Sequence, residues 1–332
     1  MSFLENLLAV AQKVGLLFIL IAIGFVCQRV KLLTEEANKR MADIVMYIVT
    51  PCVIVNAFSA TMYEKAELLA ILKNIGVVTL IAALTHIAMI LAVMMIFRSK
   101  DESRRCIMRF AAVFSNAGFI ALPLAQALID TPTSREGSLY AAVFLAVFNI
   151  VLWTWGYVDM SGKSEGMNWK KIAFNPGIIG VVSGLIIFTS PLYLTFGNMV
   201  GIRLPSLITD AIAAMSALNL PLPMLMVGYY LGKADLIAAL RDMQSYLCMA
   251  LRLLVFPMTL LGVLYLCGVR GNVLTVSVIG ACAPVGATTT IFAAKFGHDT
   301  ALSVRLVSLS TIFSLVTMPL IVGLTQMLGT LH

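Results

Sequence analysis

Charged residues are scarce in this chain. Only 12% of its 332 residues are Asp, Glu, Lys or Arg, whereas 60% are hydrophobic, and the mean hydropathy is +0.97. Soluble domains carry about 25% charged residues, so this sequence cannot cover a water-exposed surface of ordinary polarity. The composition excludes a soluble enzyme, a secreted disulfide scaffold and a nucleic-acid-binding domain. No nucleic acid partner is inferred from the net charge of +7.

Motifs for catalysis and metal binding are also missing. None of the six cysteines forms a Cys-x-x-Cys pair, and most lie in apolar stretches, which is typical of small buried hydrophobic residues. The sequence has no Gly-x-Ser-x-Gly elbow, phosphate-binding glycine loop, His-Glu-x-x-His or paired-carboxylate motif. Glu5 precedes the first apolar run and no small-residue cleavage site follows it, so we expect no removable signal peptide. We expect no enzymatic activity, cofactor or metal.

Long apolar runs are abundant. Ile75–Phe97 and Ala141–Tyr157 are each long enough to cross a bilayer core of about 30 Å as a helix. The sequence therefore predicts an all-α polytopic protein embedded in the lipid bilayer, forming a single membrane domain over residues 1–332. Breaking the runs at charged or Gly/Pro/Asn clusters gives ten spans, near residues 7–28, 40–58, 70–97, 106–129, 137–159, 172–194, 206–231, 245–268, 272–296 and 301–328.

The basic residues are distributed asymmetrically over these spans. Counted with the flanking helix ends, which include Arg252, the connections that follow spans 1, 3, 5, 7 and 9 hold 17 of the 23 Lys and Arg residues. The other side holds 6. Because basic residues collect in cytoplasmic loops, this asymmetry predicts a bacterial-type inner membrane protein with both termini outside.

Five spans in each half have a geometric consequence. If the halves share a fold, repeat two (about 170–332) must be inverted relative to repeat one (about 1–160), as in many secondary transporters. Breaks occur at corresponding spans: Pro51 and Pro221 interrupt spans 2 and 7, while Ser115–Gly118 with Pro123 and Ala283–Gly286 interrupt spans 4 and 9.

A broken helix offers backbone N–H groups and about half a positive elementary charge at its new N-terminus. Such ends bind anions at the bilayer midplane. Asn116 stands beside the break of span 4 as a neutral donor, whereas Ser115 and Thr288 are explained equally well as interhelical hydrogen-bonding residues. The candidate substrate-binding residues are Asn116, Ser115, Pro123, Pro284, Thr288, Pro51 and Pro221.

Acidic residues avoid the predicted span centres. All 16 lie at helix ends or in loops, with Asp43 and Asp210 closest to the interior, which argues against an antiporter built on buried aspartates. His86 lies near the centre of span 3. It is a candidate for proton coupling, with a neutral histidine bonded to a backbone carbonyl as the alternative.

Several motifs together resemble the auxin efflux carrier family, in the bacterial permease branch of the bile acid/sodium symporter-like superfamily. The resemblance covers nearly the whole chain, and the order and spacing of the motifs make it specific. The matching segments are Ile23-Gly24-Phe25 with the following basic Arg29–Lys31, Thr50-Pro51, Ser115-Asn116-Ala117-Gly118-Phe119-Ile120-Ala121-Leu122-Pro123-Leu124, Asn175-Pro176-Gly177-Ile178, Leu220-Pro221-Leu222-Pro223-Met224-Leu225-Met226-Val227-Gly228, Ala283-Pro284-Val285-Gly286-Ala287 and Ala293-Ala294-Lys295-Phe296-Gly297.

The resemblance implies two inverted five-helix repeats in which spans 4 and 9 cross at their broken centres. It also implies a scaffold of spans 1, 2, 6 and 7, a transport body of spans 3–5 and 8–10, elevator-like alternating access and a small organic anion as substrate. The chain departs from the plant members in its short central connection, and Ala283 stands where they carry an asparagine before Pro284. This departure argues against auxin itself as the substrate.

The expected function is thus secondary active transport of a small carboxylate such as malonate or malate. A proton or sodium ion is the candidate coupling ion, and a homodimer is a candidate assembly. The alternative is a membrane-embedded binding or sensory module that acts with a separate partner.

Overall fold

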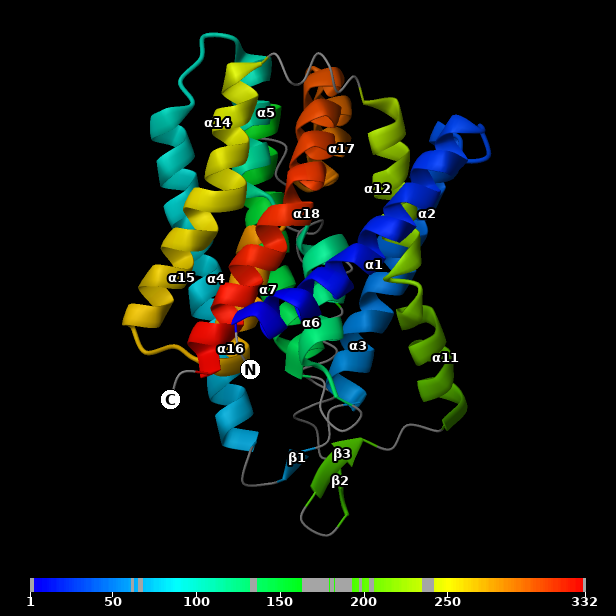
Figure 1. Ribbon diagram of the computed structural model, residues 1–332. Helices are drawn as coiled ribbons and strands as arrows, with labels where there is room; N and C mark the ends of the chain where they lie inside the picture. The colour runs from blue at the N-terminus through cyan, green and yellow to red at the C-terminus, as the bar shows by residue number, and fades with distance from the viewer. Residues whose placement is uncertain are drawn as a thin grey trace.

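The computed structural model describes residues 3–60, 63–64, 68–131, 136–162, 179, 182, 193–196, 199–202, 206–234 and 242–330. In these ranges the chain is a bundle of helices with a small three-stranded sheet at one end (Figure 1). Seven described helices are long and apolar enough to cross a membrane. They are Leu7–Arg29, Glu35–Ala57, Leu69–Ile96, Glu136–Ser161, Leu207–Lys233, Met243–Leu266 and Thr300–Gly329. The chain is an integral membrane protein, as predicted.

The helices follow the predicted spans closely. Their bounds are α1 (Phe3–Arg29), α2 (Glu35–Ile44), η1 (Val45–Val49), α3 (Thr50–Ala60), α4 (Leu68–Ile96), α5 (Glu102–Val113), η2 (Ala117–Ala121), α6 (Leu122–Ile129), α7 (Glu136–Val151), η3 (Leu152–Gly156), α8 (Tyr157–Ser161), α11 (Ser206–Ala217), α12 (Pro221–Lys233), α14 (Met243–Ala250), η4 (Leu251–Val255), α15 (Phe256–Leu266), α16 (Gly271–Cys282), α17 (Thr288–Phe296) and α18 (Thr300–Thr330). The η elements are π-helical turns inside longer helices.

Almost all of predicted span 6 (172–194), with the motif at 175–178, lies outside the described residues. The count of ten spans and the inverted repeat therefore stay predictions. The expectation of a purely helical chain is incomplete. Strands β1 (Tyr63–Glu64), β2 (Tyr193–Phe196) and β3 (Met199–Ile202) form an antiparallel sheet in the order β1-β3-β2, with Tyr63 opposite Val200 and Tyr193 opposite Ile202.

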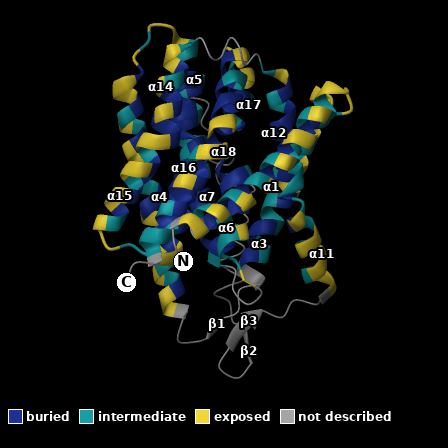
Figure 2. Cartoon of the chain, viewed as in Figure 1, coloured by how far each residue is buried: buried dark blue, intermediate teal, exposed yellow. Residues whose placement is uncertain are grey.

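The outer helices are apolar on both faces. In α4, Leu80, Leu84 and Leu91 are exposed, whereas Val78 and Ala82 on the other side are fully buried. Exposed leucines at helical spacing are the surface expected against lipid. Figure 2 shows this contrast, with the most buried segments, among them α5 and α16, in the centre of the bundle.

Two predicted proline breaks have different outcomes. Pro51 does not break its helix, because the chain absorbs the missing N–H in the π-turn η1 and Thr50 Oγ1 donates to Val45 O at 2.9 Å. The prediction of a break in span 2 is therefore wrong. Span 7 is interrupted as predicted: α11 ends at Ala217, and Pro221 starts α12 at a position where no N–H is needed.

Helix α1 packs closely on α12. A Cβ on Gly24 would meet the backbone of Leu225, and one on Gly228 would meet Ile21 O, so only glycine permits this approach. The other face of α1 contacts α18, where Gly323 lies against Leu7. Helix α1 thus joins α12 to the C-terminal helix.

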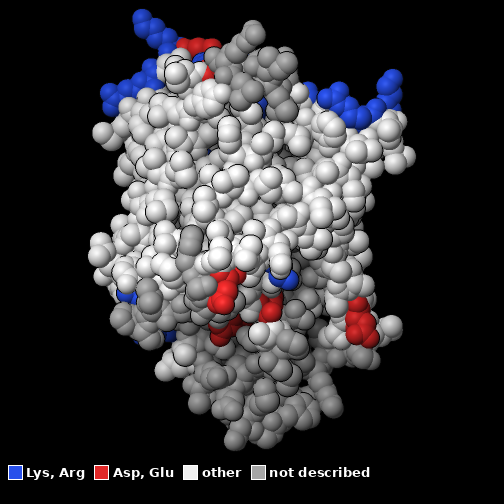
Figure 3. Space-filling view, viewed as in Figure 1, with Lys and Arg blue, Asp and Glu red and all other residues white. Residues whose placement is uncertain are grey.

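Charges gather at the two ends of the bundle. Figure 3 shows Lys and Arg mainly at one end of the visible face, separated by a wide uncharged belt from a cluster of acidic side chains near the other. The end at which α2 and α14 begin and α12 and α17 finish is called the basic end here, and it carries Lys39, Arg104, Lys233 and Lys295.

Candidate functional site

Two broken helices meet in the centre of the bundle. Helix α5 ends at Val113 and the chain resumes in η2 at Ala117, while α16 ends at Cys282 and the chain resumes in α17 at Thr288. The extended segments between them pair as an antiparallel bridge, with Ser115 opposite Val285. We call this pair of segments, residues 114–116 and 283–287, the crossing.

Backbone hydrogen bonds hold the crossing together. Asn116 N donates to Pro284 O at 2.7 Å, and Gly286 N donates to Phe114 O at 3.0 Å. Val285 N donates to Ser310 Oγ of α18, also at 3.0 Å. These bonds satisfy groups that the helix breaks would otherwise leave unpaired in a buried apolar region.

A cavity of about 1020 Å³ opens beside the crossing. The crossing supplies Ser115, Asn116 and Gly286 to its wall, and η2 and α17 supply the adjoining residues, including Thr288 and Thr290. From there the cavity extends to the basic end. Its charged lining residues are Glu35, Lys39, Asp43, Lys233, Lys295 and Arg305.

Polar atoms in this wall lack protein partners. Asn116 is 4% exposed and Thr290 9% exposed, yet neither Asn116 Nδ2 nor Thr290 Oγ1 has a hydrogen-bond partner among the described residues. The same holds for Thr288 Oγ1 and, across the cavity, Asn38 Oδ1. Because an unpaired buried polar group costs about 1–3 kcal/mol, such a cluster beside a cavity indicates a place for a polar ligand.

The structure separates the predicted site residues into two groups. Ser115, Asn116 and Thr288 line the cavity, and Pro284 contacts Asn116 through its carbonyl. Pro123, Pro51 and Pro221 are absent from the described lining of this cavity; Pro123 instead borders a separate cavity of about 250 Å³ with Lys13 and Leu220. Of the two acids closest to the interior, Asp43 lines the large cavity and is half exposed, and Asp210 is exposed on α11.

His86 is buried in α4, away from the described cavity wall. Its Nδ1 lies 2.7 Å from Ala82 O, so this nitrogen carries the hydrogen and donates it. The ring centroids of Phe144 and Phe148 lie 5.6 and 5.9 Å away. This geometry is the one anticipated for a neutral histidine that bonds to its own helix.

Arg252 is the residue that the sequence analysis misplaced. It was counted with the loops and flanking helix ends, but the structure places it in η4 within the apolar helix Met243–Leu266, 1% exposed. Its guanidinium bonds to backbone carbonyls on both sides of the crossing, including Val113 O at 2.9 Å and Ala283 O at 3.1 Å. A signal was available, because Arg252 lies inside the predicted span 245–268 with apolar neighbours, and ionisable residues in that setting mark functional sites.

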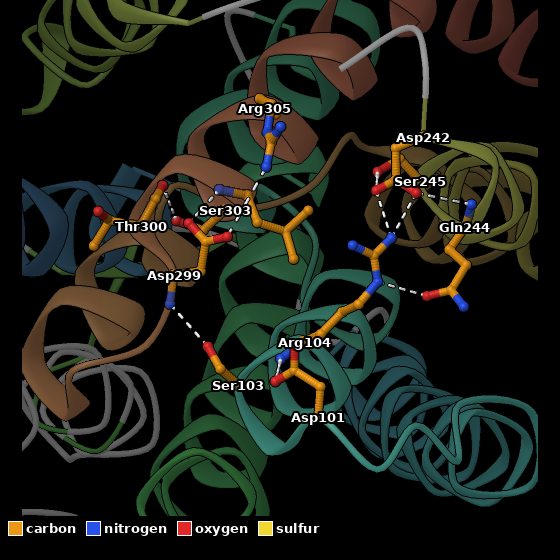
Figure 4. A network of polar contacts seen from close by, with 11 residues as sticks. Asp101, Ser103, Arg104, Asp242, Gln244, Ser245, Asp299, Thr300, Ser303 and Arg305 are labelled. Carbon is orange, nitrogen blue, oxygen red and sulfur yellow. Dashed lines mark hydrogen bonds and ion pairs between the residues drawn. The ribbon is translucent and has the colours of Figure 1, made fainter. Parts of the chain in front are cut away.

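A second arginine network lies at the basic end (Figure 4). Arg104 of α5 binds both carboxylate oxygens of Asp242, at 2.5 and 2.6 Å, and its Nε donates to Gln244 Oε1 at 2.6 Å. Burial alone would raise the pKa of Asp242, but hydrogen bonds from Arg104 and Ser245 hold that pKa below its ordinary value.

The same network caps helices. Asp101 accepts from Arg104 N at the start of α5, and Asp242 accepts from Gln244 N at the start of α14. Asp299 accepts from Leu302 N at the start of α18, while its own N–H donates to Ser103 Oγ at 2.9 Å (Figure 4). Each carboxylate satisfies first-turn donors and complements the helix dipole.

An integral membrane protein with two broken helices that cross beside a cavity with polar atoms in its wall has the architecture of a transporter. The family model described as "Membrane transport protein" matches residues 9–168 and 160–322, nearly the whole chain. The chain belongs to this family of membrane transport proteins, the auxin efflux carrier family, as the motifs predicted.

Similar proteins occur in archaea and plants. An uncharacterized transporter of Methanocaldococcus jannaschii is 24% identical over 311 residues, covering 92% of this chain and 95% of that protein. A probable auxin efflux carrier component 5b of Oryza sativa is 27% identical over 162 residues, 48% of this chain and 41% of its own. Auxin efflux carrier component 1 of Arabidopsis thaliana is 27% identical over 146 residues, 42% of this chain and 22% of its own.

Proposed function

We propose that this transporter is a secondary carrier of a small organic anion such as malonate or malate, bound at the crossing. The observation that supports it most is the group of unpartnered polar atoms, Asn116 Nδ2, Thr288 Oγ1 and Thr290 Oγ1, in the wall of the cavity. A carboxylate can accept hydrogen bonds from all three and faces the positive ends of α17 and of the helix Ala117–Ile129.

The charges along the cavity favour an anion as well. Lys39, Lys233, Lys295 and Arg305 line it, against Glu35 and Asp43. Lys233 and Glu35 are paired at 2.7 Å, which leaves the basic side chains in excess. An excess of one sign of charge along a cleft raises the local concentration of oppositely charged substrates. If the basic end is cytoplasmic, the cavity is open to the cytoplasm.

The crossing is tested by uptake of radiolabelled malonate and malate into vesicles that hold equal amounts of protein. Asn116→Ala removes the amide, and Pro284→Ala alters the segment whose carbonyl binds Asn116 N. We expect each variant to lose at least about tenfold in uptake, roughly 1.4 kcal/mol, because one lacks the amide donor and the other has a changed backbone at the crossing. Wild-type rates in both variants contradict a site at the crossing.

Matched controls exist elsewhere in the chain. Asn272→Ala removes an amide that bonds to Glu136 Oε2 at 2.6 Å at the end opposite the basic end, and Pro319→Ala changes a proline inside α18. Both should leave uptake within about twofold of wild type. Malonate or malate binding by the wild type without any uptake supports the alternative of a binding or sensory module.

Alternating access requires two bodies that move against each other. We propose that α1, α2, η1, α3, α11 and α12 belong to the scaffold, with span 6, and that the helices of spans 3–5 and 8–10 form the transport body. The packing of α1 on α12 and of α3 on α11 supports this division, and the contacts of α1 with α18 and of α3 with α7 form the interface at which the two bodies would move. The cavity lies between the two groups: Asn38 and Tyr230 face it from the scaffold, and Asn116 and Thr290 from the transport body.

Cross-linking tests the elevator movement. In α18, Ser308 Oγ donates to Tyr230 O of α12 at 3.5 Å, so cysteines at these two positions link the proposed bodies. In a background without the six native cysteines, oxidation of the cysteines at 230 and 308 to a disulfide should abolish uptake, and reduction of the disulfide should restore it. The control pair is 104 and 244, which lies within the transport body and should leave uptake active when cross-linked. Full uptake with 230 and 308 linked contradicts an elevator.

The coupling ion is proposed to be a proton, with sodium as the other candidate. His86 is the relay that the sequence suggested, although its ring lies among phenylalanines rather than on the described cavity wall. His86→Gln decides its role. A changed pH profile of uptake supports the relay, and an unchanged profile assigns His86 a packing role in α4.

A further inference from the structure

Arg252 is one of the largest side chains that the fold buries completely. None of the described carboxylates forms an ion pair with it. A cation in the low-dielectric interior of a membrane protein is expensive, so its surroundings must provide equivalent negative charge.

Backbone carbonyls provide that charge. Nη1 donates to Val113 O at 2.9 Å and Ala112 O at 3.3 Å, in the last turn of α5. On the other side, Nε donates to Ala283 O at 3.1 Å and Nη2 donates to Gly280 O and Ala281 O, at the end of α16. One side chain therefore binds the C-terminal ends of both broken helices.

The charges balance. Each helix C-terminus carries about half a negative elementary charge, so two of them offer about one, which matches the single positive charge of the guanidinium. The planar fork of arginine spreads five N–H donors toward carbonyls of both helices, whereas the compact ammonium of lysine has three donors on one atom. Arg252 thus neutralises the negative ends at the crossing.

The positive N-terminal ends of the two broken helices are not neutralised. The N-termini of α17 and of the helix Ala117–Ile129 begin only a few residues beyond the neutralised C-termini, on the side of the crossing that borders the cavity. Without Arg252, the negative charge at the C-terminal ends of α5 and α16 would cancel much of the electrostatic field of these N-termini. With it, the crossing carries a net positive charge next to the unpartnered Asn116 Nδ2 and Thr290 Oγ1.

We propose that Arg252 is a positioning residue that neutralises the C-terminal ends of α5 and α16, so that the crossing selects an anion over a neutral molecule of the same shape. This inference rests on the proposed function, because it explains the charge preference of the proposed substrate site. It adds a residue that does not line the described cavity and acts through the two helices.

The experiment compares the dissociation constants of malonate and of its neutral analogue malonamide in purified protein. The preference is the ratio of the malonamide constant to the malonate constant. We expect the wild type to prefer malonate by at least about tenfold, the scale of one favourable partly buried dipole interaction. Arg252→Gln should lower the preference to about twofold or less, and Arg252→Lys should keep it within about threefold of wild type despite a lower melting temperature.

A change in the malonate preference distinguishes an electrostatic role of Arg252 from a packing role, because a purely structural defect weakens the binding of both ligands equally. The matched control is Arg270→Gln, which removes an arginine that donates to Tyr265 O in the last turn of α15 and to Val269 O just beyond it, remote from the crossing. It should leave the preference unchanged.

The outcomes distinguish the two proposals. If the wild type shows no preference for malonate, the proposed anion site fails. If the wild type prefers malonate and folded Arg252→Gln keeps that preference, only the role of Arg252 is overturned. The same holds if Arg270→Gln lowers the preference as much as Arg252→Gln does. If Arg252→Gln does not fold, Arg252→Lys decides: a retained preference supports the proposal, and a tenfold loss overturns it.

Discussion

Arg104 of α5 and Arg252 of η4 are neutralised in different ways. At the basic end, Arg104 pairs with the carboxylate of Asp242, and both side chains are partly exposed, at 29% and 19%. In the centre, Arg252 is buried and pairs with carbonyls of two helix ends. One arginine is matched by a charge, the other by dipoles.

The difference follows from the surroundings. Near water, a carboxylate costs little to place and caps a helix as well, as Asp242 does for α14. At the centre, a carboxylate would add its own desolvation cost and would repel an anionic substrate from the crossing. Helix ends supply the negative charge there without a second ion.

The same substitution at both arginines should have unequal effects. Arg252→Met leaves five carbonyls without a partner, and at about 0.6 kcal/mol for each hydrogen bond inside a membrane protein the free energy of unfolding falls by about 3 kcal/mol. Arg104→Met should cost below about 1 kcal/mol, because its pair is partly exposed. Unfolding in detergent measures both, and equal losses contradict the contrast.

Gly286 tests how tightly the crossing is packed. A Cβ there would lie 2.8 Å from Ser115 O and 3.0 Å from Thr288 Oγ1, so Gly286→Ala should destabilise by about 1–3 kcal/mol and weaken malonate binding. Gly262→Ala is the control. It lies in α15 with open space around its Cβ, and alanine there should stabilise by about 0.5–1 kcal/mol. A neutral Gly286→Ala would mean that the crossing tolerates expansion.

Thr290 and Thr311 separate binding from stability. Thr290 Oγ1 has no described partner, so Thr290→Val should hold or raise the melting temperature while weakening malonate binding about tenfold, or roughly 1.4 kcal/mol. Thr311 Oγ1 donates to Val307 O at 2.7 Å, so Thr311→Val should lower the melting temperature and leave binding unchanged. Unchanged binding in Thr290→Val removes this hydroxyl from the site.

The smallest effect is the pH dependence of the pair at the basic end. The folded-state pKa of Asp242 is lowered, so the stability that its pairing contributes is complete above the unfolded pKa of about 3.9 and is lost as pH falls through the folded value. The difference in stability between wild type and Arg104→Met, below about 1 kcal/mol, should therefore be present at pH 7 and fade below about pH 4. A difference that does not decrease as the pH is lowered assigns the contact to packing.

Sequence patterns predicted most of the fold because lipid imposes a strong constraint. Long apolar runs identify helices, and glycine with small polar residues at Ser115–Gly118 and Ala283–Gly286 identified the two breaks. The π-turn before Pro51 could not be predicted, because the sequence does not show whether a proline breaks its helix or only widens one turn. The strands at 193–196 and 199–202 were not predicted, because they adjoin the apolar run that was assigned to span 6.

The candidate site was predicted in part. Asn116, Ser115 and Thr288 line the cavity because they stand at the breaks, whereas Pro51 and Pro221 are absent from its described wall although they too mark irregular turns. Arg252 was missed because counting basic residues toward topology assigned it to a helix end. Its five carbonyl partners come from residues about 30 and 140 positions away, and such long-range contacts leave no local pattern.

Binding of a small organic anion at the crossing can be observed directly. The most direct measurement is a crystal structure with 2-bromosuccinate, in which bromine replaces the hydroxyl of malate, located by the anomalous scattering of bromine. A bromine peak in the large cavity against Asn116 and Thr290 is the predicted result. A peak only at the mouth beside Lys39 and Lys233, or in the separate cavity beside Pro123, would contradict the account.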